Sequence, residues 1–461
     1  MFSTFQVVMV IGTVLLLTLA GVHIAVALGA TAVLGAFLMV GDWGVVFQFI
    51  SSTAYEALRD YVFAVIPLFL LMGGFLAQSG AARDIFTLIN RGLRFLPGRL
   101  GLATVGANAL FAFVTGVSIA AAAAFSRIAY PEMRRAGYDK GFSAGCIAGS
   151  SCLGMLIPPS VLMIVWGVLT EQSVGQLFLA GVGPGLLLAL LFCLYILLTA
   201  VTRPHIVGVG VPGQSVTWQG QSAETTARAA AADSALDENL SQAFFGTILV
   251  LGLVAFILGG IWMGAFTPTE GAGVGAAAAL VIALIRGVRF KEIREVVLQV
   301  GRTSAPLLLL LFCAQLYSRV LSMTGITGAI QTIFTNSGMD LWAIILVMVL
   351  IWFVLGCLID SISIILITVP VFAPVAHAAG MDPIAFAMLG ILAIESGLLT
   401  PPFGILVFTV KASLPADEIT VGQIFRYSIP YWICLLIVVL TIWFFPSIAT
   451  WLPDYVFNVN K

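Results

Sequence analysis

The sequence contains few charged residues. Of its 461 residues, 9% are charged and 61% are hydrophobic, and the mean hydropathy is +1.11. A typical soluble domain has roughly 25% charged residues. A chain this apolar cannot cover a water-exposed surface with polar groups, so most of its surface must face lipid. The net charge of −1 and the absence of any basic block exclude nucleic acid as a partner.

Residues that build common catalytic and metal sites are also scarce. The three histidines are scattered, and the six cysteines lie in apolar segments without paired short spacing. We therefore expect small buried cysteine side chains, no transition-metal site, no cofactor and no enzyme activity. The sequence has no glycine-rich phosphate loop, which excludes direct use of ATP. Energy for any work across a membrane must therefore come from an ion gradient or the membrane potential.

Long apolar runs make up most of what is present. Runs of about 17–25 residues are long enough to cross a bilayer as helices. The sequence therefore predicts an all-α polytopic membrane protein with about a dozen spans, several of them broken. The first run has no Lys or Arg before it, so we expect a membrane helix and not a signal peptide. The predicted spans cover residues 4–20, 22–40, 61–78, 100–114, 142–170, 178–201, 244–263, 265–285, 303–322, 341–357, 384–412 and 427–451.

A polar segment near the middle divides the chain into two halves, and these halves repeat one pattern. Residues 203–243 separate the apolar regions 1–202 and 244–461, and we expect a loop there that is partly helical around 223–242. An ungapped shift of 243 positions superposes helix-breaking residues of the two halves. The matches are Ser118-Ile119 with Ser361-Ile362, Pro131 with Pro374, Asp139 with Asp382, Gly154 with Gly397, and Pro158-Pro159 with Pro401-Pro402.

Loop charges indicate that this repeat is inverted. The loop 79–101 contains four arginines, whereas its second-half partner 324–340 contains no Lys or Arg; conversely, 286–302 is basic and its partner 41–60 is not. Positively charged loops stay in the cytoplasm, so equivalent loops are expected on opposite faces. This predicts periplasmic termini and a cytoplasmic loop at 203–243. Inverted repeats with interrupted helices are the architecture of secondary transporters.

Each half contains a helix break rich in small and hydroxylated residues. We expect residues 110–130 to form a re-entrant hairpin whose tip exposes backbone carbonyls and the hydroxyls of Thr115 and Ser118. Pro158-Pro159 then interrupts the next span, because proline lacks an N–H donor and clashes with the preceding turn. Non-helical backbone at membrane depth is tolerated only when it is buried in protein or lines a cavity. The exposed oxygens suit a desolvated Na⁺.

The second half repeats this plan and adds carboxylates. Asp360 and Glu395 lie in otherwise apolar stretches, where an unpaired charge is costly and is usually functional. We expect Asp360, Ser361 and Ser363, with Ser396, Gly397 and Thr400, to complete a second cation site. The competing interpretation is that Pro and Gly only kink these helices and that Ser bonds to backbone. Because the two breaks occupy equivalent positions in the two halves, we favour a functional role in ion binding.

Three further side chains have no single role fixed by the sequence. Arg127 either meets an anionic substrate or lies at the base of the first hairpin and reaches toward water. Arg319 either pairs with a carboxylate or contacts a partner helix, and the role of Glu395 is open. An intramembrane enzyme is disfavoured, because the hydroxyls lack a basic partner and no His lies near either motif.

These residues lie in stretches that resemble the large membrane subunit of the tripartite ATP-independent periplasmic (TRAP) transporters. The matching stretches cover both halves outside residues 203–242. They include IPLFLLMGGFLAQSG (66–80), YPEMRRAGYDKGFSAG (130–145), LGMLIPPSVLMIVWG (153–167), CLIDSISIILITVPVFAPV (357–375) and SGLLTPPFGILVFTVK (396–411).

The resemblance implies a bacterial inner-membrane protein that works with a small four-helix membrane subunit and a periplasmic substrate-binding protein. It implies Na⁺-coupled import of a small organic acid by an elevator motion, as in the ion transporter superfamily. Scaffold helices would lie in 1–60 and 244–302, and transport elements in about 61–175 and 303–415, with a last helix at 427–451. The implied Na⁺ ligands are Thr115, Gly116, Ser118, Ser150, Ser151, Gly154, Asp360, Ser361, Ser363, Ser396, Gly397 and Thr400, beside the helix breaks Pro158, Pro159, Pro401 and Pro402.

The chain departs from the family at the first hairpin, where Val117 and Ala121 stand in place of hydroxylated residues. This leaves the exact ion ligands and their stoichiometry open. A stand-alone Na⁺- or H⁺-coupled carboxylate symporter or antiporter of the same superfamily is the alternative. Uptake of free solute by this chain alone would favour this alternative over an importer that depends on a binding protein.

Overall fold

The computed structural model describes residues 4–59, 61–208, 240–325, 328, 332, 338 and 340–458. This part of the chain is helical, with one isolated backbone bridge between Tyr138 and Val207. Residues 209–239, which are most of the polar segment 203–243, lie outside the described residues, as does most of the loop 324–340. The partly helical stretch expected around 223–242 therefore falls outside them except for its last three residues, 240–242.

The first half contains helices that match the predicted spans closely. They are α1 (Thr4–Leu19), α2 (Ile24–Val40), α3 (Trp43–Arg59), η1 (Tyr61–Ala64), α4 (Val65–Gln78), α5 (Ala81–Gly92), α6 (Arg99–Thr115), α7 (Ser118–Arg135), α8 (Lys140–Ser151), α9 (Leu153–Leu156), α10 (Val161–Thr170), α11 (Val174–Thr202) and η2 (Pro204–Ile206).

The second half has a corresponding series. It consists of α13 (Leu240–Trp262), α14 (Pro268–Ile285), α15 (Phe290–Met323), α17 (Leu341–Gly356), α18 (Ser361–Ala378), α19 (Pro383–Gly397), α20 (Ile405–Ser413), α21 (Val421–Phe444) and α22 (Ser447–Asn458). The last span, expected over 427–451, is divided into α21 and α22 before Pro446. The scaffold–transport boundary expected at 302–303 falls within the continuous helix α15.

Membrane-spanning length is confirmed for most of the predicted runs. In the part of the chain that the structure describes, eight helical segments are long and apolar enough to cross a membrane. Helices α2, α6, α17 and α19 are apolar but shorter. Helix α5 was expected to be part of a loop. It forms because its apolar residues recur at helical spacing, so that Ala82, Ile85 and Phe86 are buried while Arg83 and Arg91 leave the opposite face polar.

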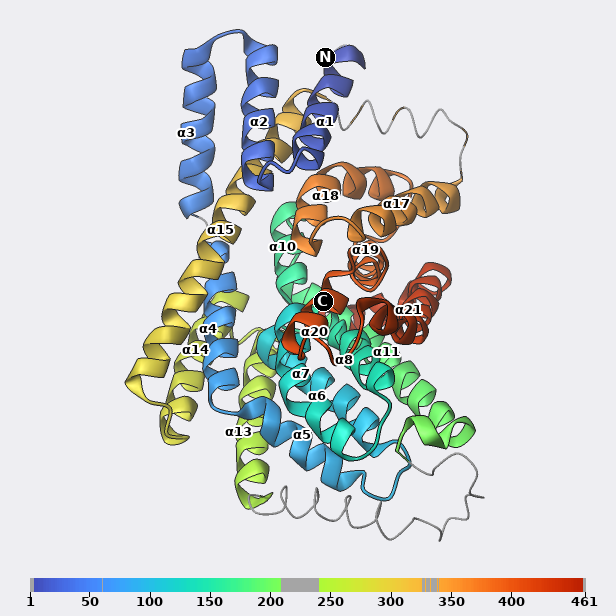
Figure 1. Ribbon diagram of the computed structural model, residues 1–461. Coiled ribbons are helices and arrows are strands. Elements are labelled where there is room, and N and C mark those ends of the chain that lie inside the picture. Colours follow the sequence, from blue (N-terminus) through green and yellow to red (C-terminus); the bar gives the residue numbers. More distant parts are fainter. Residues whose placement is uncertain are drawn as a thin grey trace.

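The helices form two packed groups (Figure 1). The long helix α15 packs against α2 and α3 toward one end and against α4, which also packs on α14. The second group contains α6, α8, α11, α19 and α21. The most buried segment is Lys140–Thr170, in which 89% of an apolar window is inside the protein, so the core is centred on α8 to α10.

Small residues let α21 approach this core. A Cβ atom at Gly141, Gly145 or Gly149 of α8 would lie 2.3, 2.7 or 2.2 Å from atoms of Tyr427 or Tyr431 of α21. Glycines four residues apart form one stripe of a helix and permit close helix contact in membranes. The composition of α8 therefore determines which helix it packs against.

The repeated residues occupy equivalent helix boundaries. Ser118 begins α7 and Ser361 begins α18, and each follows a short turn between two packed helices, α6–α7 and α17–α18. Asp139 and Asp382 cap the N-termini of α8 and α19 through their side chains. The pairs Pro158-Pro159 and Pro401-Pro402, both with cis peptide bonds, follow those helices. The relative orientation of the two halves in the membrane stays a prediction.

Candidate functional site

The first hairpin tip packs directly against the first helix break. Helix α6 ends at Thr115, and Gly116 reverses the chain with a φ of 60°. A Cβ at Gly116 would lie 2.3 Å from the carbonyl oxygen of Pro159, so only glycine fits there. The backbone N–H of Val161 donates to the Gly116 carbonyl at 3.2 Å. The tip and the Pro-Pro break therefore form one unit.

The second hairpin approaches its break in a similar way. A Cβ at Gly397 would lie 2.5 Å from the Cα atom of Gly356, so the end of α17 touches the end of α19. Asp360 caps α18, and its carboxylate accepts hydrogen bonds from the Ser363 backbone N–H at 3.1 Å and the Ser363 hydroxyl at 2.5 Å. Asp360 is exposed and faces its own helix end. Its role as an ion ligand stays a prediction.

The two hairpins meet at the carboxylate of Glu395 on α19. The side chain is 1% exposed. The Ser118 hydroxyl donates to one carboxylate oxygen at 2.8 Å, and the Ser361 hydroxyl donates to the other at 3.1 Å. These serines are the first residues of α7 and α18, whose N-terminal partial positive charges also favour a carboxylate. Glu395 therefore joins equivalent positions of the two repeats.

Sequence reasoning left the role of Glu395 open. The sequence nevertheless contains a signal for a functional residue here, because Glu395 is the single carboxylate in the apolar stretch before Thr400-Pro401. Its connection to Ser118, 277 residues earlier, is visible only in the folded chain.

A second polar group lies beside the first break. The Asn108 amide donates to the Ser150 hydroxyl at 2.7 Å, and Ser150 donates to the Cys146 carbonyl at 2.7 Å. Ser151 donates to the Ile147 carbonyl at 2.6 Å. The Oδ1 atom of Asn108 is buried and has no hydrogen-bond partner among the described residues. Asn108 was not identified from the sequence, although an amide in the apolar run 100–114 is itself a signal.

The other predicted hydroxyls bond to nearby backbone. Ser396 donates to the Ala393 carbonyl at 2.6 Å, Thr400 to the Ser396 carbonyl at 2.9 Å, and Thr115 to the Phe111 carbonyl at 3.3 Å. Each oxygen retains lone pairs that can face an ion. A Cβ at Gly154 would lie 3.1 Å from the backbone of Ser118, so this residue also borders the first tip.

The candidate site therefore consists of oxygen donors from both repeats. The structure brings Ser118, Ser361 and Glu395 into direct contact and places Gly116 and Gly154 beside them. Groups of three His, Cys, Asp or Glu side chains that could hold a metal ion are absent from the described residues. Hydroxyl, amide and carboxylate oxygens suit a hard cation rather than a transition metal. Such a donor set fits Na⁺.

The arginines that the sequence left undecided lie elsewhere. Arg319 pairs with Glu56 of α3 at 2.5 Å and donates to Thr53 at 3.2 Å, so the carboxylate alternative is confirmed. Arg127 is exposed on α7, and both alternatives for its role stay predictions.

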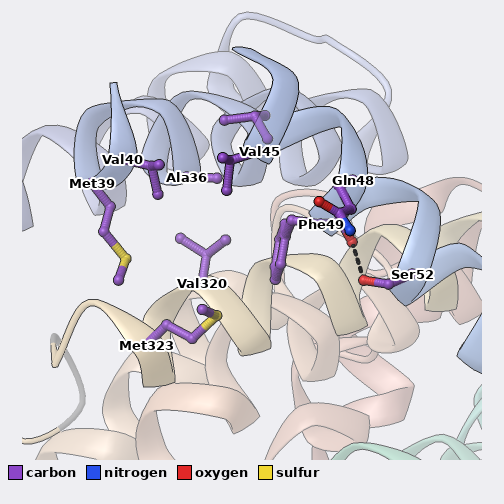
Figure 2. A pocket seen from close by; sticks show the side chains of 10 residues that line it. Ala36, Met39, Val40, Val45, Gln48, Phe49, Ser52, Val320 and Met323 are labelled. Atoms are coloured by element: carbon purple, nitrogen blue, oxygen red, sulfur yellow. Dashed lines mark hydrogen bonds between the residues drawn. The ribbon is translucent and has the colours of Figure 1, made fainter. Parts of the chain in front are cut away.

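An apolar cavity lies away from the hairpin tips, between α2, α3 and α15 (Figure 2). Its volume is about 310 Å³, and its walls include Met39, Val45, Phe49, Val320 and Met323. Gln48 and Ser52 are the polar lining residues, and the Ser52 hydroxyl already donates to the Phe49 carbonyl at 3.0 Å. The lining contains no charged side chain. The hairpin tips, and not this cavity, are therefore the candidate ion site.

Comparison with known proteins identifies similar chains along nearly the whole sequence. The family profile described as "Tripartite ATP-independent periplasmic transporter, DctM component" matches residues 11–448. The chain is 33% identical over 403 residues to the C4-dicarboxylate TRAP transporter large permease protein DctM of Pseudomonas aeruginosa, covering 87% of this chain and 88% of that protein.

Other relatives are named for different solutes. The ectoine TRAP transporter large permease protein TeaC of Halomonas elongata is 28% identical, covering 99% of this chain and 100% of that protein. The sialic acid TRAP transporter large permease protein SiaM of Vibrio cholerae is 26% identical, covering 88% of this chain and 90% of that protein.

Solved structures share the fold at low sequence identity. The YdaH transporter of Alcanivorax borkumensis has a TM-score of 0.59 and 15% identity, covering 95% of this chain and 98% of that one. MtrF of Neisseria gonorrhoeae also has a TM-score of 0.59, with 13% identity, covering 97% of this chain and 95% of that one. At these identities the likeness concerns the fold alone.

Proposed function

Since the chain belongs to the DctM component family of the tripartite ATP-independent periplasmic transporters, we propose that it is the large membrane subunit of a Na⁺-coupled importer of an organic acid. The family is one of transporter permeases and not of enzymes. The chain is accordingly a multi-pass membrane protein, and we assign it to the bacterial inner membrane.

Its partners follow from the tripartite organisation of the family. We assign to this chain a small four-helix membrane subunit and a periplasmic substrate-binding protein. The binding protein delivers the solute, and this chain moves it across the bilayer. The names of two relatives, a C4-dicarboxylate transporter and a sialic acid transporter, support an acid as the solute. The ectoine transporter shows that solutes vary within the family.

The convergence of both hairpin tips on buried oxygens is the observation that best supports ion coupling. Ser118 and Ser361, from equivalent positions, contact one carboxylate. Interrupted helices place carbonyl oxygens where Na⁺ binds in secondary transporters, and helix N-termini there face anionic solute groups. The chain's own residues would remove the ion's hydration shell, while the starts of α7 and α18 favour an anionic solute nearby.

Alternating access requires one part of the chain to move against another. We propose that the transport elements, in about 61–175 and 303–415, slide as a unit against the scaffold helices in 1–60 and 244–302, in an elevator motion. The close backbone contacts at Gly116 and Gly397 support rigid hairpin–break units that move together.

Reconstitution tests this function. Proteoliposomes containing the chain and its small subunit are supplied with the periplasmic binding protein of the same transporter and with radiolabelled succinate, sialic acid or ectoine. Uptake of one solute is expected only with all three proteins and an inward Na⁺ gradient. Uptake by the chain alone would support the stand-alone symporter, and uptake indifferent to Na⁺ would contradict Na⁺ coupling.

A further inference from the structure

Glu395 is a buried acid without a cationic side chain beside it. It forms no ion pair with any described residue, whereas Arg319 pairs with Glu56 and Arg286 pairs with Asp84 at other places in the fold. A buried carboxylate is strongly unfavourable unless hydrogen bonds, dipoles or a cation compensate its charge. The hydroxyls and helix starts of the two tips supply part of that compensation. A small cation would supply the rest.

Only one repeat contains this acid. The position equivalent to Glu395 in the first half is Cys152, which is 1% exposed. The serines are duplicated by the repeat, but the carboxylate is not. One negative charge therefore serves both hairpin tips, and its two oxygens are divided between them.

The two serines offer oxygen ligands beside this carboxylate. Ser118 and Ser361 each donate a hydrogen bond to Glu395, which leaves their oxygen lone pairs free to face a cation. Hydroxyl and carboxylate oxygens are the kind of ligand that a hard cation such as Na⁺ prefers. A further buried oxygen, Oδ1 of Asn108, has no hydrogen-bond partner among the described residues, and the Asn108 amide is bonded to Ser150 of α8.

On the basis of the proposed Na⁺ coupling, we propose that Glu395 is a Na⁺ ligand shared by the two repeats. Its carboxylate supplies the negative charge of the ion site, and Ser118 and Ser361 hold it between the hairpin tips. Because both tips contact the same group, an ion bound beside one tip changes the electrostatic environment of the other. Na⁺ binding in the two halves is therefore interdependent.

The test measures Na⁺ binding directly on the purified, detergent-solubilised chain. The melting temperature is followed against NaCl concentration at constant ionic strength with choline chloride, for the wild type, Glu395→Gln and Glu395→Asp. Glutamine keeps the size of the side chain and removes its charge. Glu295→Gln, on the exposed face of α15, is the control because it removes one carboxylate far along the chain from either tip.

We expect Glu395→Gln to raise the Na⁺ concentration at half-maximal stabilisation at least tenfold, Glu395→Asp to raise it less, and Glu295→Gln to leave it unchanged. A lower melting temperature with an unchanged Na⁺ midpoint in Glu395→Gln would show a structural role only and overturn the proposal. If Glu395→Gln does not fold, an unchanged midpoint in Glu395→Asp overturns it equally.

The same titration separates this proposal from the proposed function. A wild-type chain that Na⁺ stabilises, with variants that respond identically, removes Glu395 from the site and leaves Na⁺ coupling intact. If Na⁺ does not stabilise the wild-type chain and uptake is independent of Na⁺, both the role of Glu395 and the proposed Na⁺ coupling are wrong.

Discussion

At the residue scale, the fold assigns different tasks to two carboxylates that look alike in the sequence. Asp360 and Glu395 both interrupt apolar stretches. In the fold, Asp360 is exposed and caps α18 through Ser363, whereas Glu395 is buried and joins the two hairpins. A carboxylate at a helix start is stabilised by the free N–H groups there, so Asp360 needs no ion to explain its presence.

Two variants separate capping from ion binding at Asp360. Asparagine also caps helices well, so Asp360→Asn should fold and express normally, while the loss of charge should lower Na⁺-dependent uptake. Asp360→Ala loses both features and should be less stable than Asp360→Asn by about 1 kcal/mol. Uptake assays and thermal melts measure the two effects. Normal Na⁺ dependence of uptake in Asp360→Asn would leave Asp360 with the capping role alone.

At the element scale, each hairpin is held to its helix break by backbone contact. The ends of α17 and α19 touch through Gly356 and Gly397, with no side chain between them. Backbone cannot move aside as a flexible side chain can. The geometry of the ion site therefore depends on two glycines that provide no ion-binding side chain themselves.

Gly397→Ala tests this contact. The new Cβ would lie 2.5 Å from the Gly356 Cα, so we expect a loss of stability of about 2 kcal/mol or more and a loss of Na⁺-dependent uptake. Gly252→Ala in α13 is the matched control, because nothing lies within 4 Å of its added Cβ and alanine favours helix. Full uptake by Gly397→Ala would show that hairpin and break are not rigidly joined.

At the scale of the whole molecule, the two halves place equivalent residues at equivalent helix boundaries, and loop charges predict that they face opposite ways. The chain spans the membrane many times, so this orientation decides which face each hairpin opens to. An inverted pair supports alternating access around one central site. A parallel pair of halves would instead open both hairpins to the same face of the membrane.

Cysteine labelling in intact cells tests the orientation. Arg135 and Ala378 are exposed and related by the 243-residue shift. We expect a membrane-impermeant maleimide to label Ala378→Cys from the periplasm and to label Arg135→Cys only after the cells are opened. The unsubstituted chain, whose six cysteines are buried or half-buried, measures the background. Labelling of both positions from the same side would contradict the inverted repeat.

Much of the architecture follows from the sequence because its signals are local. Apolar run length sets the spans, and Pro-Pro pairs break helices wherever they occur. The runs at 61–78, 142–170 and 244–263 lie close to the segments Tyr61–Gln78, Lys140–Thr170 and Leu240–Trp262. Helices α3 and α5 were not expected, because amphipathic periodicity over a short or partly polar segment is a weak signal. The segment Ser361–Ala378 of α18 is long and apolar enough to span a membrane but lies outside the predicted spans.

The sequence by itself determined the membrane class, the helix breaks and the duplicated serines, because each depends on residues close together along the chain. Only the tertiary structure decided that Ser118 and Ser361 share Glu395, that Asn108 lies beside Ser150, and that Arg319 pairs with Glu56. These contacts join residues 34 to 277 positions apart. No local pattern specifies such pairs, since they arise from helix packing that buries apolar surface and places the few polar groups together.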